Sequence, residues 1–192
     1  MRIIAGEFRS RNIVAPKGER TRPTSDRARE SLFNVLSHSV DLEEARVLDL
    51  FAGSGALGFE ALSRGASHVT FVEHFLAARE AIEVNIRALG VRDRTSLVKL
   101  DAYKWLPEAS GPFDLVFADP PYDDKRTRRE LPELLVRDGL LTPDSLVIIE
   151  HRAGSTIAIP AGARKVRDLE AGEATFTFIQ TASASGNLSG DV

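Results

Sequence analysis

The chain has 192 residues, no cysteine and a net charge of −3 at pH 7, with 43% hydrophobic and 28% charged residues. This composition is typical of a soluble protein with one sizeable core, and it excludes disulfides, thiolate metal sites and cysteine nucleophiles. No apolar run reaches the roughly 20 residues of a membrane-spanning helix, and no secretory signal opens the chain. We therefore expect a cytoplasmic protein that does not bind membranes and, because its four histidines are scattered, holds no metal.

Residues 1–22 predict a basic N-terminal arm. Short apolar pieces on either side of Gly6 favour a small β-hairpin there. Residues 1–29 contain eight Arg and Lys residues and three acids, a net charge of +5, so the remaining chain carries −8. A second basic cluster occupies 125–129. A charged run is usually a solvated face, but two clusters that bracket one candidate site can neutralise phosphates.

Beyond the arm, the hydrophobic periodicity predicts alternating helices and strands. A first helix is expected within 22–39, started by Pro23 with Thr24 or Ser25. Further helices are expected at 55–64, 75–89 and 127–138, strands at 45–51, 68–73, 95–101, 113–119 and 145–151, and strand-like segments with no helix between them at 156–160, 164–170 and 174–180. This pattern predicts a mostly parallel, doubly wound α/β sheet with antiparallel C-terminal edge strands over 23–180, followed by a disordered tail at 181–192.

Four of the predicted strands have an acid at or near their carboxyl ends. Asp49 lies in the first strand, and Glu73, Asp101 and Asp119 close the next three. A single strand-terminal acid is more often a helix cap or a surface carboxylate. In an open α/β sheet, however, ligands bind outside the carboxyl ends of the strands. Four acids on one rim therefore predict a binding site there.

The stretch DLFAGSGALG follows the first strand and matches the pattern G-x-G-x-x-G at Gly53, Gly55 and Gly58. With Glu73 twenty positions after Gly53, it could bind a dinucleotide, or it could be a glycine-rich turn without a ligand. The charge of Asp49, placed just before the turn, disfavours a pyrophosphate. A ligand with a cationic head suits that charge better.

S-adenosylmethionine is such a ligand, because its ammonium and sulfonium groups are positive. Its ribose hydroxyls would meet Glu73, and its adenine would lie near Asp101 and Ala102. The residues expected to bind it are Asp49, Phe51, Gly53, Ser54, Gly55, Glu73, Asp101 and Ala102.

The stretch ADPPYDD, residues 118–124, places two prolines and an aromatic ring directly after the fourth strand-terminal acid. An exocyclic amine on a nucleobase is a poor nucleophile, because its lone pair is delocalised into the ring. If Asp119 and a proline carbonyl each accept one N–H, the lone pair is oriented toward a methyl donor, and Tyr122 can stack on the base. The alternative is a stiff connection between a strand and a helix.

The stretches MRIIAG, TRPTSDRARESLFNVL, VLDLFAGSGALGFEALSRGA, VTFVE, FDLVFADPPY and VIIEH occur in this order. Over residues 1–152 the chain resembles the RsmD-type 16S rRNA guanine-N2 methyltransferases of bacteria. The resemblance implies a Rossmann-like methyltransferase fold, S-adenosylmethionine as donor, and a guanine of 16S rRNA, in a partly or fully assembled small ribosomal subunit, as acceptor. It implies catalytic roles for Asp119, Pro120, Pro121 and Tyr122, and an N-terminal arm that grips RNA. From the two basic clusters together, the residues expected to contact RNA are Arg2, Arg9, Arg11, Arg22, Arg27, Lys125 and Arg126. We expect the protein to be a monomer.

Two positions depart from the family pattern, which usually has glycine where Leu100 precedes Asp101 and tyrosine where Ala171 precedes Gly172. Other activities stay open on the residues alone. An adenine-N6 methyltransferase acting on RNA or DNA uses a similar tetrapeptide, although the chain has no room for an inserted target-recognition domain. Protein glutamine methylation usually needs asparagine in place of Asp119, and a nicotinamide oxidoreductase needs hydride-transfer residues that are not found. A non-catalytic RNA-binding module would have no use for four acids around a pocket.

Overall fold

The computed structural model describes residues 1–16 and 26–181. Its helices are α1 (Asp26–Leu36), α2 (Ala56–Ser63), α3 (Leu76–Leu89), α4 (Ala102–Trp105) and α5 (Glu130–Leu135), with 3₁₀ turns η1 (Arg92–Arg94), η2 (Leu106–Glu108) and η3 (Lys125–Arg128). Its strands are β1 (Arg46–Leu50), β2 (His68–Val72), β3 (Thr95–Val98), β4 (Phe113–Ala118), β5 (Leu141–Arg152), β6 (Ala163–Ala171) and β7 (Ala174–Thr181). The predicted RNA contact Arg22, the helix-start signals at 23–25 and the tail from residue 182 lie outside the described residues.

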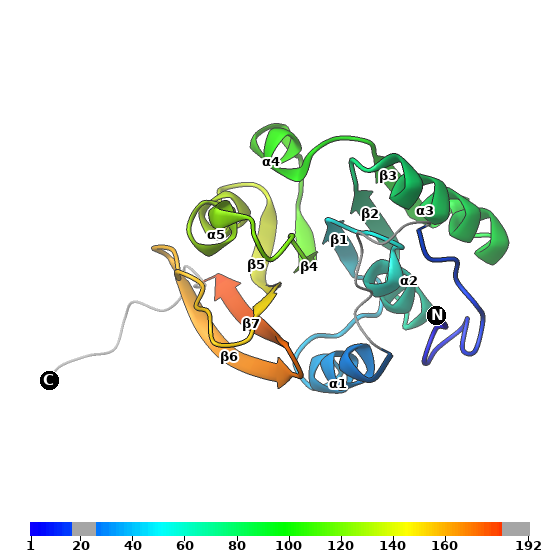
Figure 1. Ribbon diagram of the computed structural model, residues 1–192, viewed down its shortest axis with the longest axis horizontal. Helices are drawn as coiled ribbons and strands as arrows, with labels where there is room; N and C mark the ends of the chain where they lie inside the picture. The colour runs from blue at the N-terminus through cyan, green and yellow to red at the C-terminus, as the bar shows by residue number, and fades with distance from the viewer. Residues whose placement is uncertain (17–25, 182–192) are drawn as a thin grey trace, which may run out of the picture.

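The seven strands form one sheet in the order β3-β2-β1-β4-β5-β7-β6 (Figure 1). Strands β1 to β5 pair in parallel, while β7 runs antiparallel to both β5 and β6. This topology confirms the predicted doubly wound α/β sheet with antiparallel C-terminal edge strands. The chain builds outward from β1 to β3 and then returns to place β4 on the other side of β1. The sheet therefore has its topological switch point between β1 and β4, where such folds bind ligands.

Two predicted elements in the C-terminal half differ from the structure. The strand expected at 156–160 is not formed, because this segment crosses the surface instead of pairing with the sheet. The N–H of Ala158 donates to the carbonyl of Arg128 in η3 at 2.8 Å, and Ile157 packs into the core. The apolar alternation that suggested a strand thus reflects the packing of a loop. The helix expected at 127–138 is shorter and is divided at Arg129 into η3 and α5.

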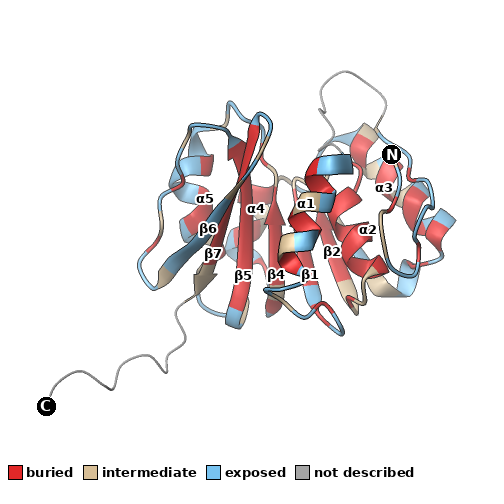
Figure 2. Cartoon of the chain, turned by 90° about the horizontal axis from the view of Figure 1, so that it is seen from below, coloured by how far each residue is buried: buried red, intermediate tan, exposed pale blue. Residues whose placement is uncertain are grey.

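Two layers of apolar side chains cover the sheet. One layer comes from α1, α2, α3 and the N-terminal segment, and the other from α4, α5 and η2. Because successive strand residues point to opposite faces, Val47 enters the first layer and Leu48 the second. Figure 2 shows the central strands buried, whereas most of β6 at the sheet edge is exposed. None of the helices within 1–16 and 26–181 is long and apolar enough to span a bilayer.

The strand register aligns the carboxyl ends of the central strands. Leu50, the last residue of β1, pairs with Val72 on β2 and with Ala118 on β4, and Val72 pairs in turn with Val98 on β3. Adjacent strands lie about 4.8 Å apart. The connections that follow β1, β2, β3 and β4 therefore leave the sheet side by side at one rim.

The N-terminal segment packs onto this sheet domain through α2. The buried carboxylate of Glu60 accepts hydrogen bonds from the N–H groups of Ile4 (2.8 Å) and Ala5 (3.1 Å). Phe8 is buried in the core layer of α2, and its N–H donates to the hydroxyl of Ser63 at 2.9 Å. The predicted hairpin is reduced to one isolated bridge between residues 2 and 12.

Candidate active site

The three glycines of the G-x-G-x-x-G motif serve two purposes, one in the turn after β1 and one in α2. Gly53 and Gly55 have φ values of 56° and 77°, in the left-handed region that side chains disfavour. Gly58 lies inside α2, where an added Cβ would come within 2.4 Å of the Phe71 ring on β2. The first two glycines shape the turn, and the third allows the helix to approach the sheet. Phe51 also has a positive φ, 57°, which is unusual for an aromatic residue and marks a tightly held backbone.

Glu73 holds this turn from the end of β2. Its carboxylate accepts the N–H of Gly53 at 2.9 Å and the N–H of Phe75 at 2.8 Å, and the residue is 5% exposed. An ionised carboxylate offers about four acceptor positions, so these two bonds leave capacity for further donors. Glu73 therefore lies where the sequence places it, and it also shapes the loop that it borders.

Asp49 lies beneath the turn and not on the surface of the rim. It pairs with Phe117 one residue before the end of β1, is 2% exposed, and accepts the N–H of Gly58 at 3.0 Å. Burial raises its pKa to about 8, the Gly58 hydrogen bond opposes that shift, and the nearby charge of Glu73 adds to it. Removal from water therefore favours the protonated acid in the unliganded protein, whereas the sequence led us to expect a charged one.

This burial predicts a pH-dependent stability. The folded protein holds a proton on Asp49 up to about pH 8, whereas an unfolded aspartate loses it near pH 4. Between these values the folded state binds more protons, so its stability falls as the pH rises. We expect Asp49→Asn to remove this loss, gaining about 2–4 kcal/mol over wild type between pH 5 and pH 8 in urea unfolding. Parallel pH profiles for the two proteins would contradict the assignment.

The third predicted acid acts as a helix cap. Asp101 lies outside β3, which ends at Val98, and its carboxylate accepts the N–H groups of Tyr103 and Lys104 at 3.1 and 3.2 Å. The structure thus corrects the prediction that Asp101 closes a strand, because the chain leaves the sheet three residues earlier. Ala102, the first residue of α4, is buried.

An aromatic residue that the sequence prediction did not include lies on this side of the rim. The ring of Tyr103 meets that of Phe51 edge to face, with centroids 5.7 Å apart. The guanidinium of Arg126 lies 3.7 Å from the centroid of Tyr103 and also pairs with Asp124 at 2.9 Å. Arg126, a predicted RNA contact, therefore links the loop after β4 to α4.

The motif of residues 119–122 begins directly at the end of β4. The N–H of Asp119 donates to the carbonyl of Leu50 at 3.3 Å, which ties this corner to the end of β1. The carbonyl of Pro121 accepts the N–H of Asp124 at 2.9 Å and closes a tight turn. The register and this bond bring the predicted catalytic acid and the glycine turn together at the switch point.

Tyr122 contacts two residues of β5 that the sequence prediction missed. Its hydroxyl donates to Oε1 of Glu150 at 3.0 Å, and the guanidinium of Arg152 lies 5.6 Å from its ring centroid. Glu150 is 6% exposed. The rule that identified Glu73 applies equally here, because the stretch VIIEH puts an acid near the end of an apolar strand just as VTFVE does.

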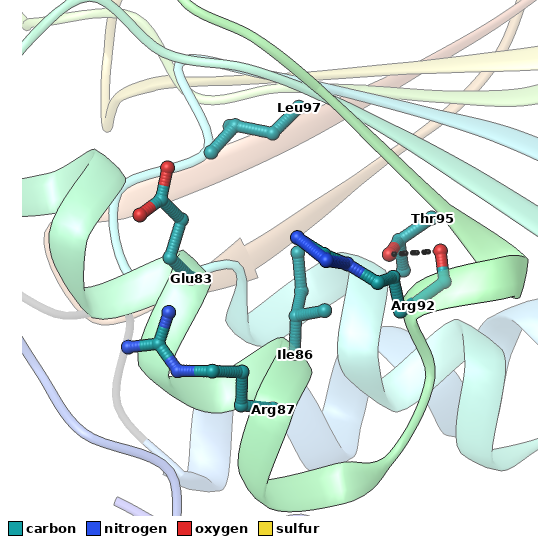
Figure 3. Close-up of a pocket in the computed structure, with 6 residues that line it drawn as sticks. All are labelled: Glu83, Ile86, Arg87, Arg92, Thr95 and Leu97. Carbon is teal, nitrogen blue, oxygen red and sulfur yellow. Dashed lines mark hydrogen bonds between the residues drawn. The ribbon is translucent and has the colours of Figure 1, made fainter.

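A cavity of about 210 Å³ borders this corner. Its lining comes from three segments, the motif with the residues that follow it, η3, and the end of β5, and includes Pro120, Pro121, Tyr122, Thr127, Arg128, Glu150, His151 and Arg152. A second cavity of about 220 Å³ lies between α3 and β3 and is lined by Glu83, Ile86, Arg87, Arg92, Thr95 and Leu97 (Figure 3). The second cavity touches no predicted site residue. In residues 1–16 and 26–181, no group of three or more His, Cys, Asp or Glu side chains is arranged so that it could bind a metal ion.

The predicted RNA contacts in the described residues are exposed, but they are not equally available. Arg11 donates to the carbonyl of Ala88 at the end of α3 at 2.5 Å. Arg29, which contributes to the positive charge counted from the sequence, is 0% exposed and bonds to Asp26 and to the carbonyl of Arg2. The basic surface is therefore smaller than the sequence suggests. The other exposed members are Arg2, Arg9, Arg27, Lys125 and Arg126, of which Arg126 pairs with Asp124 and Tyr103.

Comparison with known proteins identifies the family. The family described as "Conserved hypothetical protein 95" matches residues 1–180. The ribosomal RNA small subunit methyltransferase D proteins of Escherichia coli K12 and Haemophilus influenzae are each 34% identical to this chain, over 94% of it and over 89% and 93% of their own lengths. The solved structure of yhhF from Escherichia coli superposes with a TM-score of 0.83 at 34% identity, covering 95% of this chain and 98% of that one. The fold is thus the Rossmann-like methyltransferase fold, and the chain belongs to the Conserved hypothetical protein 95 family, the RsmD-type proteins.

Proposed function

We propose that this protein transfers a methyl group from S-adenosylmethionine to the N2 amine of a guanine in 16S rRNA. The proposal also states that the protein is a monomer and acts in the cytoplasm, and that its substrate is a partly or fully assembled small ribosomal subunit. The observation that carries the proposal is the register of Leu50 with Ala118, which sets the glycine turn and the Asp-Pro-Pro-Tyr corner side by side. The names of the relatives, rRNA small subunit methyltransferase D, support the substrate class.

The residues at the rim suit the donor. S-adenosylmethionine supplies a methyl group on a positively charged sulfur, which makes that carbon electrophilic. Glu73 retains acceptor positions beside the turn for ribose hydroxyls. Phe51, directly after β1, is partly exposed and offers apolar surface for the adenine ring. Ala102, predicted to contact the adenine, is buried at the start of α4 and offers no such surface in the unliganded protein. A positive charge close to Asp49 would also lower the pKa of that acid and favour its ionised form.

The acceptor residues would orient the amine. We assign one N–H acceptor to the carboxylate of Asp119 and the other to the carbonyl of Pro120, since the Pro121 carbonyl already closes the turn. With both hydrogens held, the nitrogen lone pair points at the methyl carbon. Positive charge develops on the nitrogen during transfer, and a fixed carboxylate stabilises it most in the transition state. Tyr122 would stack on the base, and one proton leaves the nitrogen for solvent after transfer.

A nucleoside analysis tests this function directly. The purified protein is incubated with methyl-labelled S-adenosylmethionine and small ribosomal subunits or 16S rRNA from cells that lack the gene. We expect label in N2-methylguanosine at one position after digestion to nucleosides. Label in N6-methyladenosine, in protein, or in no product would reject the proposal.

The role of the N-terminal segment in RNA binding can be tested at Arg9, which is exposed. We expect Arg9→Glu to weaken RNA binding and to reduce the slope of log affinity against log salt by about 1, because one phosphate contact is lost. Arg167→Glu on β6 is the matched control. It makes the same charge change at the β6 edge of the sheet, whereas the N-terminal segment that carries Arg9 contacts α2 and α3. Filter binding over a salt series measures both slopes. Equal effects of the two substitutions would show that only the overall charge matters.

A further inference from the structure

A buried glutamate stands next to the proposed catalytic acid. Ala118, the last residue of β4, pairs in parallel with Ile149 on β5. The next residues along the two chains are Asp119 and Glu150, so these two acids are neighbours at the rim, about one strand spacing apart. Glu150 is 6% exposed and lines the cavity beside the Pro-Pro corner.

A hydrogen bond fixes the carboxylate of Glu150 relative to the ring of Tyr122, on which the base would stack. One of its oxygens accepts the hydroxyl of Tyr122 at 3.0 Å, at the edge of the aromatic ring. A base stacked on that ring lies about 3.5 Å above it. Because a carboxylate has about four acceptor positions, Glu150 can bind the tyrosine and also accept a hydrogen bond from the edge of the stacked base.

The Watson–Crick edge of guanine presents two adjacent donors, the N1–H and the N2 amine. Adenine presents an unprotonated N1 at the corresponding place. A carboxylate accepts the N1–H of guanine but repels the lone pair of adenine N1, and a buried acceptor left unpaired is strongly unfavourable. Two acceptors on neighbouring strands match the two guanine donors.

We propose that Glu150 determines base specificity by accepting the N1–H of the target guanine, while Asp119 holds the N2 amine. This inference rests on the proposed guanine methylation. It assigns the choice between guanine and adenine, which the Asp-Pro-Pro-Tyr motif leaves open, to a residue of β5 outside that motif.

The test uses 2-aminopurine, which keeps the 2-amino group of guanine but has no hydrogen on N1. The target guanine, once mapped, is replaced by 2-aminopurine in the RNA substrate, and kcat/KM is measured on both substrates. We expect wild type to prefer guanine by about 10²-fold or more. The variant Glu150→Gln, whose amide can donate to the bare N1, should reduce that preference at least tenfold. The missing O6 of 2-aminopurine affects both enzymes and cancels in the comparison.

The variant Tyr122→Phe is the matched control, because it removes the hydroxyl that Glu150 accepts but keeps the ring. Its preference for guanine should fall less than that of Glu150→Gln, because the carboxylate remains although it loses one hydrogen bond, and its rate should also fall. The inference is overturned if Glu150→Gln lowers turnover of both substrates equally, or if Tyr122→Phe loses the preference to the same extent. If Glu150→Gln is inactive on both RNAs, the comparison rests on the wild-type enzyme. Comparable turnover of the guanine and 2-aminopurine RNAs by wild type would contradict the assignment. Wild-type activity on the guanine substrate reports the proposed function separately.

Discussion

Replacing Asp119 with alanine is expected to lower kcat for methyl transfer by about 10³-fold and to leave the affinity for S-adenosylmethionine within a few fold of wild type. The reason is that the carboxylate would act on the amine, on the acceptor side of the corner. The backbone bond from the N–H of Asp119 to Leu50 does not involve the side chain and should persist. Single-turnover transfer measures the first effect, and calorimetry with S-adenosylmethionine measures the second.

The control removes an exposed acid elsewhere, Asp138→Ala, in the loop after α5. Its turnover and donor affinity should equal those of wild type. Unchanged turnover in Asp119→Ala would remove Asp119 from the mechanism. A parallel loss of donor affinity in that variant would instead place its carboxylate in the donor pocket.

The largest effect on stability is expected at Gly6. An added Cβ there would lie 1.7 Å from the carbonyl oxygen of Ser63, which is backbone and cannot move aside, and the φ of 81° is strained for any side chain. We expect Gly6→Ala to reduce the free energy of unfolding by about 3 kcal/mol or more, lowering Tm by roughly 6–12 °C. Hydrogen exchange should rise at Glu7, whose N–H donates to the same carbonyl at 2.7 Å.

The variant Gly172→Ala shows how much of the effect at Gly6 comes from the positive φ and how much from the close contact with Ser63. Gly172 also has a positive φ, 68°, but an added Cβ would meet nothing within 4 Å. This substitution should reduce stability by only about 1 kcal/mol, the expected strain of a left-handed alanine. Similar losses for the two variants would mean that Gly6 is required for its φ alone and not for contact with α2.

The fold could be predicted in large part because buried parallel strands leave a strong signal. The strands expected at 45–51, 68–73 and 113–119 each extend one or two residues beyond those of the structure, since strands covered on both faces are nearly continuous apolar runs. The segment 156–160 alternates apolar and polar residues as an edge strand would, but it forms a loop that is hydrogen-bonded to η3. Only its tertiary contacts distinguish this packed loop from a paired strand.

The sequence allowed us to predict which connections meet at the site, but not which of the charged residues are buried. The rule that ligands bind at strand ends correctly grouped the glycine turn with the Asp-Pro-Pro-Tyr corner. A displacement of one residue along β1 decides whether Asp49 is on the rim or beneath it, and sequence patterns do not resolve one residue. Arg29 adds to the positive charge of the sequence but not to that of the surface, because its position on α1 faces the core.

The N-terminal segment and the glycine turn share one side chain. Asn85 on α3 exchanges two hydrogen bonds with Val14, at 2.7 and 3.0 Å, and donates a third to the carbonyl of Ser54 at 3.1 Å. If RNA binds the N-terminal segment, as proposed above, its binding would therefore also act on the loop that borders the proposed cofactor. Thermodynamic reciprocity then requires RNA and S-adenosylmethionine to change each other's affinity by the same factor, and Asn85 is the side chain that the two regions share.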